Sequence, residues 1–427
     1  MRQYKDSGIE RIGKIPEEWE IGRIKNNIVF NPENTNSNKE LEVSYMPMEC
    51  LRFNHIIEKT AKYRDVSSYT PFEEGDIVMA KVTPCYENGN IAIAKNLKNG
   101  HGYGTSEIFV IRASRSLYTE YLFYYLYTPY VINRAVSSMV GTGGLKRINP
   151  TFFLNTSLLI PPVQEQQRIA NYLDEKCGEI DGLIALQEKM ILQLTDYKQS
   201  VITEAVTKGL NHNAKLVPSG IDWIGEIPEG WKVFALKWLM ELYAGATPKS
   251  DNENLWDGDI PWITPADYKT EDIFVSGGRR NISQKGLESC ATTILPKGSI
   301  IFSKRAPIGL VAINSEPLCT NQGCIGCIVN QSRALNKYYY YTLSIFKEQF
   351  ELYGSGTTFK EISATKFADF IVPVPPLLEQ QEIVRYLDDK CSEIDKLIDV
   401  KQQKIEKLKD YKKGVIYEAV TGKINIE

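Results

Sequence analysis

An internal repeat constrains the fold of this chain more than any other feature of its sequence. Residues 161–210 align with residues 375–424 without a gap, and 27 of the 50 aligned positions are identical. Both copies open with Pro-Pro, contain no further proline, and place apolar residues at alternating steps of three and four. This spacing is a heptad pattern, which predicts a long helix with one apolar seam in each copy.

A helix of about 45 residues is about 65 Å long, and its apolar seam stays exposed unless a second helix covers it. We therefore expect the two copies to pack on each other as an antiparallel coiled coil. Polar residues interrupt the seam at Gln187 and Lys198 in the first copy and at Lys401 and Lys412 in the second. The predicted contact residues are Ile180, Ile184, Ile191, Leu194, Ile394, Ile398, Ile405 and Leu408.

A second repeat precedes each globular region, since residues 7–19 return as residues 219–231. The chain therefore runs twice through a lead-in segment, a globular domain and a long helix. This order predicts an α+β fold with an internal pseudo-twofold repeat, in which the end of the chain lies near its beginning. The predicted segments are the lead-ins 1–19 and 213–231, the globular domains 20–160 and 232–374, and the helical regions 161–212 and 375–427.

Composition limits the cellular compartment and the kinds of binding partner that we expect for this protein. The chain has 427 residues, of which 43% are hydrophobic, and no apolar run is long enough to cross a membrane. Its first residues do not form a signal peptide, and its eight cysteines lack the spacing of a small disulfide-linked domain. We expect a cytoplasmic protein with reduced thiols. The net charge of −3 taken alone argues weakly against a nucleic-acid partner.

The two globular domains share landmarks although they diverge strongly elsewhere. Each has a Gly turn followed by a β-branched run, a short polar segment, a tyrosine-rich helix and a closing Gly-rich loop. The paired segments are 72–81 with 295–304, 105–107 with 320–322, 121–127 with 338–343, and 141–148 with 354–362. Closely similar helices that hold two divergent domains indicate one framework with two independent readers.

These motifs resemble the specificity subunit of type I restriction–modification systems. The resemblance rests on "SGIERIGKIPEEWE", on "PPVQEQQRIANYLD" and "PPLLEQQEIVRYLD", and on "GSGTTFKEIS", and it covers essentially the whole chain. It implies a non-catalytic subunit whose two target-recognition domains each read one half of a bipartite site in double-stranded DNA, while the helices separate them. It also implies two methyltransferase subunits that use S-adenosylmethionine, and then restriction subunits that use ATP and Mg.

The distribution of charged residues agrees with domains that bind DNA and helices that do not. The two domains are nearly neutral, with 15 Lys and Arg against 13 Asp and Glu in residues 20–160, and 15 against 14 in residues 232–374. The first long helix carries 4 basic and 8 acidic residues over 163–207, so it would repel phosphate. We expect DNA to meet the domains through local clusters, with weak affinity for the chain alone.

The loops beside the strand ends are the candidate DNA contacts, because Arg and Lys suit guanine edges and phosphates, and Asn and Gln suit adenine. The alternative is that their glycines only allow tight turns and their charges are solvated. For the loop 245–250, a surface loop over the aromatic residues Trp256 and Trp262 is an equally good interpretation. The candidates are Lys81, Thr83, Tyr86, Asn88, Gly143, Lys146, Arg147, Thr247, Lys249, Ser250, Lys304, Arg305, Asn321, Gln322, Thr357, Thr358 and Lys360.

Signals for catalysis and metal binding are weak. The sequence Asn149-Pro150-Thr151-Phe152 is similar to the Asn-Pro-Pro-Phe box of adenine methyltransferases, but its third residue is Thr and no glycine-rich strand–turn–helix precedes it. We interpret Asn149 as a helix N-cap. Cys319, Cys324 and Cys327 lack a fourth ligand for zinc and are interpreted as core residues.

No Gly-x-x-x-x-Gly-Lys-Ser/Thr sequence is present, so we expect the chain itself not to hydrolyse ATP. The tyrosine-rich helices are interpreted as core elements and not as platforms for stacked bases. Two other functions remain open at this point: an autonomous adenine methyltransferase, and a coiled-coil scaffold without a nucleic-acid role.

Overall fold

The chain forms two compact units, each of which combines a mixed α+β part with portions of two long helices. The computed structural model describes residues 2–33, 38–57, 59–142, 144–269, 272–305, 307–354 and 360–426. Unit 1 contains residues 1–188 and 402–427, and unit 2 contains residues 189–401. The predicted α+β fold class is confirmed. Among the described residues, no helix is long and apolar enough to cross a membrane.

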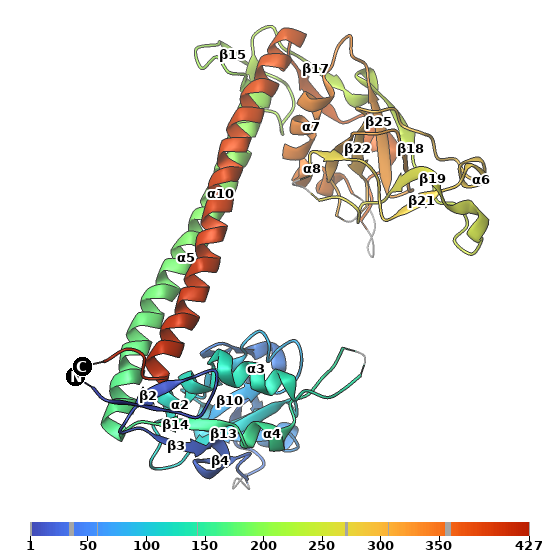
Figure 1. Cartoon of the computed structure of the whole chain (residues 1–427). Helices are drawn as coiled ribbons and strands as arrows, with labels where there is room; N and C mark the ends of the chain where they lie inside the picture. The colour runs from blue at the N-terminus through green and yellow to red at the C-terminus, as the bar shows by residue number, and fades with distance from the viewer. Residues whose placement is uncertain are drawn as a thin grey trace. The chain divides into compact units, whose positions relative to one another are not determined.

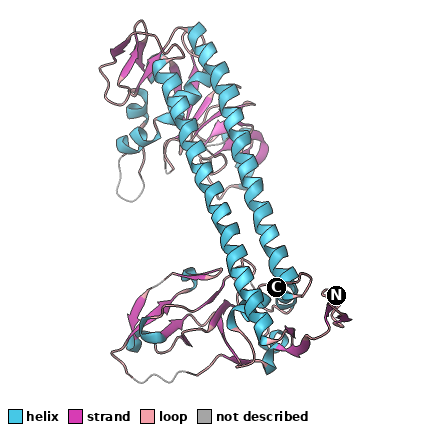
Figure 2. Cartoon of the chain, turned by 90° about the vertical axis from the view of Figure 1, so that its left-hand side faces the viewer, coloured by secondary structure: helices cyan, strands magenta, loops and turns pink. Residues whose placement is uncertain are grey.

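The two repeat copies form the long helices α5 (Val163–Lys208) and α10 (Leu377–Val420), so the predicted pair of long helices is confirmed. In unit 1 the first part of α5 lies antiparallel beside the last part of α10. In unit 2 the second part of α5 lies beside the first part of α10 (Figures 1 and 2). Each helix therefore contributes to both units.

Burial along both helices follows the predicted seam. Ile180, Ile394 and Ile405 are 4%, 3% and 2% exposed. The remaining seam positions are half-buried, namely Ile184, Ile191, Leu194, Ile398 and Leu408. By contrast, the apolar residues between the seam positions face solvent, among them Leu183, Leu186, Leu192 and Leu397. A side chain's place in the heptad, more than its hydrophobicity, thus decides whether it is buried.

Two of the three seam lysines, Lys198 and Lys412, bond to the opposite helix, one in each unit. In unit 1 the Lys412 ammonium lies 2.7 and 2.8 Å from the two carboxylate oxygens of Asp181, and 4.4 Å from the ring centre of Phe53. In unit 2 the Lys198 ammonium lies 2.7 Å from both carboxylate oxygens of Asp395. Because a half-buried or buried ammonium is costly unless paired, these contacts favour one helix register. Gln187 is also buried, and its Oε1 has no hydrogen-bond partner among the described residues.

The globular part of unit 1 is built on two four-stranded sheets. The first has the order β11 (Ile91–Ile93), β10 (Ile77–Ala80), β13 (Ile108–Ala113), β4 (Ile28–Phe30). The second has the order β8 (Thr60–Lys62), β5 (Glu42–Met46), β12 (His101–Gly104), β9 (Thr70–Glu73). The small hairpin β6 (Leu51–Arg52) with β7 (His55–Ile56) and the helices α1 (Tyr63–Val66), α2 (Thr119–Leu126), α3 (Pro129–Ser137) and α4 (Pro150–Leu154) complete it.

The globular part of unit 2 repeats the central sheet and differs around it. Its five-stranded sheet has the order β18 (Met240–Ala244), β25 (Cys324–Val329), β22 (Ile300–Ser303), β23 (Val311–Asn314), β20 (Phe274–Val275). A three-stranded sheet has the order β21 (Arg280–Ile282), β19 (Trp256–Ile263), β24 (Cys319–Thr320). Its helices are α6 (Gln284–Glu288), α7 (Asn336–Ile345), α8 (Lys347–Tyr353) and α9 (Ala364–Ala368).

The strand register aligns the two sheets. β10 and β22 each lie between an antiparallel strand on either side, as the match of 72–81 with 295–304 predicts. The match of 105–107 with 320–322 is wrong by one residue. Ala80 pairs with Ile108 and Ser303 pairs with Cys324, so residues 105–107 correspond to residues 321–323. Glu107 therefore occupies the place of Gly323.

The lead-in segments dock on the starts of the long helices. In unit 1, β1 (Tyr4–Asp6) pairs with β2 (Lys14–Pro16), and the Trp19 indole donates to Glu165 of α5 at 3.0 Å. In unit 2, β15 (Leu216–Pro218) pairs with β16 (Glu226–Pro228), and the Trp231 indole donates to Glu379 of α10 at 2.9 Å. Two further short ladders join each domain to its helix: β3 (Glu20–Arg23) with β14 (Ser157–Ile160), and β17 (Lys232–Ala235) with β26 (Ile371–Val374).

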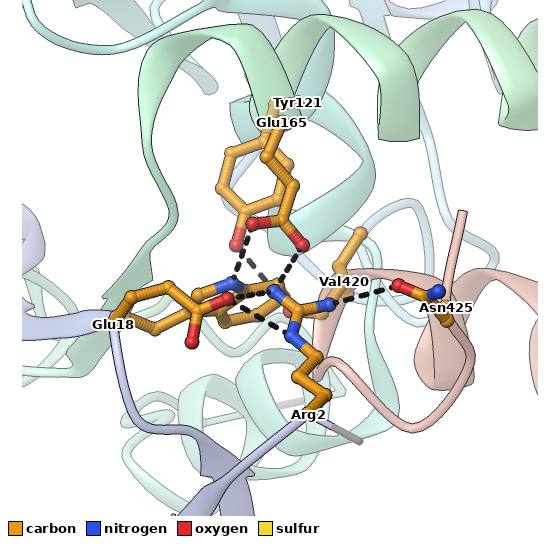
Figure 3. A network of polar contacts seen from close by, with 7 residues as sticks. Arg2, Glu18, Tyr121, Glu165, Val420 and Asn425 are labelled. Atoms are coloured by element: carbon orange, nitrogen blue, oxygen red, sulfur yellow. Dashed lines mark hydrogen bonds and ion pairs between the residues drawn. The ribbon is translucent and has the colours of Figure 1, made fainter. Parts of the chain in front are cut away.

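The two ends of the chain meet in unit 1, as predicted. The Arg2 guanidinium donates to Glu18 and Glu165 and reaches Asn425 at 3.5 Å (Figure 3). The Lys423 ammonium donates to the carbonyl oxygens of Ile12 and Lys14. Because Glu165 also receives the Trp19 indole, one carboxylate holds the lead-in segment, the helix start and the chain terminus together.

The tyrosine-rich helices belong to the core, as predicted. Tyr121 in α2 and Tyr338 in α7 are fully buried. Their hydroxyls donate to the carbonyl oxygens of Val420 and Val206, which are matching residues at the ends of the two long helices. Cys324 and Cys327 are also buried, and burial raises the pKa of the Cys324 thiol to about 12. These cysteines pack as core residues.

A lysine placed in the seam and a lysine placed on the exposed surface of the same helix should differ in their effect on stability. Ile394→Lys buries an unpaired ammonium, and we expect it to lower the free energy of unfolding by about 3 kcal/mol or more. Leu397→Lys, three residues along the same helix at a position that is 50% exposed, should leave the stability nearly unchanged. Denaturant unfolding of the two full-length variants measures this. Equal stabilities would contradict the assignment of the seam.

Candidate nucleic-acid interface

In unit 1 the candidate loops converge at the ends of β10 and β13. Lys81 directly follows β10; its backbone N–H donates to the carbonyl of Glu107 at 3.0 Å, and its carbonyl accepts from Ile148 at 2.9 Å. Three segments that are not adjacent in the sequence (81–89, 105–107 and 144–148) thereby meet. Since all three carry polar side chains, this end of the sheet presents a compact polar surface.

Thr83 holds the glycine-rich loop against the strand end. Its hydroxyl donates to the carbonyl of Gly144 at 2.8 Å and accepts from the backbone N–H of Lys146 at 2.9 Å. The hydroxyl predicted as a DNA contact is thus engaged within the protein. The side chain of Lys146 is exposed, and Gly143 lies outside the described residues.

The Arg147 guanidinium forms a two-bond ion pair with Glu107. The two N–H···O distances are both 2.9 Å, and the hydrogen bonds from Arg147 hold the pKa of Glu107 below its usual value. The Lys81 ammonium lies 5.5 Å from the ring centre of Phe109. The two cations therefore have defined positions beside one carboxylate.

The other two candidates of this loop differ in exposure. Tyr86 is only 3% exposed and burial raises the pKa of its hydroxyl, so its ring packs in the core of unit 1. Asn88 is exposed, and its backbone N–H donates to the carbonyl of Pro84 at 3.0 Å. Asn88 is thus placed at the surface and Tyr86 is not.

Each unit has such a polar surface at the end of its central strand, around Lys81 in unit 1 and Lys304 in unit 2, and we call it the polar corner of that unit. Unit 2 builds its corner from different side chains. The backbone N–H of Lys304 donates to the carbonyl of Gly323 at 2.9 Å, and its carbonyl accepts from Ile362 at 3.0 Å. Glu361 accepts from the Lys304 ammonium at 2.9 Å and from the Arg305 guanidinium at 2.8 Å. Burial pushes the pKa of Glu361 upward, but these two hydrogen bonds outweigh it, and the pKa lies below its usual value.

The third candidate loop of unit 2, residues 245–250, lies over an aromatic pair. The indole N–H groups of Trp262 and Trp256 donate to the carbonyls of Ala246 and Lys249, both at 3.0 Å. The Thr247 hydroxyl donates to the side-chain carbonyl of Gln322, which joins this loop to the β24–β25 turn. Lys249 and Ser250 are exposed. The loop is therefore a surface loop on an aromatic core that also adjoins the other candidate segments.

The remaining candidates of unit 2 lie at the same corner or outside the described residues. The Asn321 side chain accepts from the backbone N–H of Gly323 at 2.9 Å and so shapes the turn. Lys360 is exposed. Thr357 and Thr358 lie outside the described residues.

Arg280 is a further candidate that the sequence reasoning missed. Its guanidinium carbon lies 3.8 Å from the ring centre of Trp256, whose indole fixes the backbone of Lys249. The neighbouring Arg279 forms an ion pair with Asp267 at 2.8 Å. The available signal was the pair of arginines after Gly277 and Gly278, a pattern typical of an exposed turn that carries cations.

The methyltransferase-like sequence is a helix cap. The Asn149 side chain accepts from the backbone N–H of Phe152 at 3.1 Å and opens α4. In unit 2, Ser363 accepts from Lys366 at 3.2 Å and opens α9 at the matching place. Among the described residues, no group of three or more His, Cys, Asp and Glu side chains is placed to hold a metal ion.

Comparison of the sequence with known proteins finds one family. The family described as "Type I restriction modification DNA specificity domain" matches residues 16–194 and 228–410. The MjaIX specificity subunit of Methanocaldococcus jannaschii is 39% identical over 172 residues, which cover 39% of this chain and 40% of the relative. The putative MjaX specificity subunit of the same organism is 26% identical over 99% of this chain and 98% of its own length.

Solved structures share the fold. A chain from a study of complex assembly and conformational transition of the type I R-M system has a TM-score of 0.75 at 19% identity, covering 96% of this chain and 99% of its own. The HsdS subunit from Thermoanaerobacter tengcongensis has a TM-score of 0.52 at 18% identity, covering 96% and 98%. At these identities the likeness concerns the fold.

The capping role of Asn149 predicts which substitutions are tolerated. Asn149→Ala removes the acceptor and should lower the free energy of unfolding by about 1 kcal/mol, whereas Asn149→Asp keeps a good cap and should cost little. Thermal unfolding of the two variants measures the difference, with Ser363→Ala as the matched change in unit 2. Equal losses in the Ala and Asp variants would contradict the capping role.

Proposed function

The chain belongs to the type I restriction modification DNA specificity family, and we propose that its two units read the two halves of a bipartite DNA site. The observation that supports this proposal most directly is the pair of polar corners on one repeated sheet. Both corners use the same backbone contacts, through Lys81 in unit 1 and Lys304 in unit 2, but carry different side chains around them. Two surfaces with one scaffold and different chemistry suit two different base sequences.

The exposed donors of these corners match the groups that DNA offers. Arg and Lys pair with the O6 and N7 atoms of guanine or with phosphates, and Asn and Gln pair with adenine. Unit 1 offers the exposed side chains of Lys146, Arg147 and Asn88, and unit 2 offers the half-buried Arg305 and the exposed Lys360. Lys249 and Arg280 extend the surface of unit 2 beside the paired strands β19 and β21.

The chain acts within a larger complex in this proposal. Because both domains are nearly neutral, the favourable phosphate energy must come largely from partner subunits. Two methyltransferase subunits, one for each lead-in segment and helix start, would bring S-adenosylmethionine, and restriction subunits would bring ATP and Mg. The chain itself would be non-catalytic and bind none of these cofactors.

The two alternative functions lose their supporting signals. The sequence that suggested a methyltransferase caps α4, and the curated relatives are named as specificity subunits. A scaffold without a nucleic-acid role offers no reason for two polar corners that differ in charge arrangement.

Exchange of one domain tests independent reading. Replacing residues 20–160 by the corresponding domain of a relative should change one half-site of the methylated sequence and leave the other half-site unchanged. Sequencing of the methylated positions in cells that carry the hybrid and its methyltransferase subunits measures this. Exchange of residues 232–374 is the matched control and should change the opposite half-site. A single exchange that alters both halves would refute independent reading.

Helix length should set the spacer between the half-sites, since α5 and α10 each contribute to both units. Four added residues lengthen a helix by about 6 Å and rotate the residues beyond the insertion by about 40°, and one base pair rotates DNA by about 34–36°. Insertion of four residues after Gln187 and after the matching Lys401 should lengthen the spacer by one base pair, or at most two. The half-site sequences should stay the same, and an unchanged spacer would contradict this role of the helices.

A further inference from the structure

One position carries opposite charges in the two units. Arg147 and Glu361 are equivalent residues, because each precedes the isoleucine (Ile148 or Ile362) that donates to the carbonyl of the strand-end lysine. Both also form an isolated bridge to the residue after that lysine: Arg147 with Val82, and Glu361 with Arg305. The backbone is therefore the same at this place, and only the charge is reversed.

The partners of this position are reversed together with it. In unit 1, Arg147 bonds to Glu107, and the register puts Gly323, which has no side chain, at the place of Glu107 in unit 2. In unit 2, Glu361 bonds to Arg305, and the equivalent residue in unit 1 is the apolar Val82. Each unit thus has a partner for its own charge. Unit 2 lacks a carboxylate at the place of Glu107, and unit 1 lacks a guanidinium at the place of Arg305, although both units keep the strand-end lysine, Lys81 or Lys304.

The contribution of these ion pairs to stability does not explain why the charge and its partner are reversed together. The side chains are 50% and 28% exposed for Arg147 and Glu107, and 44% and 32% exposed for Arg305 and Glu361. Ion pairs with this exposure contribute little to stability because water and salt screen them. Their geometry is nevertheless well defined, since the Arg147 guanidinium uses Nε and Nη2 to hold both oxygens of Glu107. Such a pair fixes the plane and direction of the guanidinium more than it stabilises the fold.

We propose that Glu107 and Glu361 are positioning residues for DNA reading, each of which orients the cations that its unit presents to DNA. This inference rests on the proposed function. Glu107 holds Arg147 at the base of the glycine-rich loop and leaves its remaining N–H donors for a base edge or a phosphate. Glu361 holds Lys304 and Arg305 at the strand end instead. Both units keep a strand-end lysine, but the arginine comes from the glycine-rich segment in unit 1 and from the strand end in unit 2. This difference makes the charge arrangement at this corner a determinant of half-site specificity.

Neutral isosteres test the two carboxylates separately. In the complex with its methyltransferase subunits, Glu107→Gln should lower the methylation rate of the original site about tenfold or more. It should also relax only the half-site that unit 1 reads. Glu361→Gln should do the same for the other half-site. Glu107→Asp, which keeps the charge, should retain the original half-site. Unchanged half-sites in both Gln variants would overturn the proposal.

A variant in which the two charges are exchanged distinguishes two roles of the ion pair. The pair could orient a cation that reads DNA, or it could only tie the glycine-rich loop to the sheet. The double variant Glu107→Arg with Arg147→Glu keeps an ion pair at this place with its charges exchanged, and it should keep the melting temperature of the wild type. Because the cation now sits on the other segment, the original half-site of unit 1 should not return. Full recovery of that half-site would show that the pair only ties the loop, and would overturn the proposal.

Two controls identify the cause of a negative result. Glu40→Gln removes an exposed carboxylate of unit 1 that pairs with Lys62 and Arg64 away from the corner, and both half-sites should remain unchanged. Failure of the wild-type complex to methylate a bipartite site would disprove the proposed function itself. Normal methylation by the wild type with unchanged half-sites in the variants would disprove only the role of the two carboxylates.

Discussion

The seam between α5 and α10 is the contact on which both units depend. Neither core closes without both helices: the core of unit 1 contains Leu173 and Cys177 of α5 together with Ile416 and Val420 of α10. The core of unit 2 contains the matching residues of the opposite helices, among them Ile202, Val206, Leu387 and Cys391. The buried hydroxyls of Tyr121 and Tyr338 then attach each domain to the last turn of a helix. The long helices are therefore part of each domain's interior.

This repeated framework leaves the sheet corners free to differ. Buried positions such as Tyr121 and Tyr338 are held to one identity by packing and by a hydroxyl that needs an acceptor. The corner residues are restrained less, because a surface charge only requires some partner within reach. Arg147 forms its ion pair with Glu107, and Glu361 forms ion pairs with Lys304 and Arg305. Divergence of paired surface charges on a fixed backbone is a physical route by which two readers of common design acquire different targets.

The sequence predicted the parts of this structure that are periodic or local. A heptad repeat over about 45 residues has few alternative folds, and an Asn before a Pro at a helix start has a local capping role that the structure confirms at Asn149. The corners were located only approximately, because their contacts join residues far apart in the chain. Glu107 and Arg147 are 40 positions apart, and no spacing rule relates them. Tyr86 shows the same limit, since a ring in a polar loop turned inward to the core.

We infer that one chain carries two independent readers and that the length of its helices sets the spacer between their half-sites. The most direct measurement is the methylated sequence in cells that contain the wild-type chain with its methyltransferase subunits. We expect a single bipartite motif in which two different half-sites flank a spacer of constant length and unspecified sequence. A continuous motif, two identical half-sites, or a spacer of variable length would contradict it.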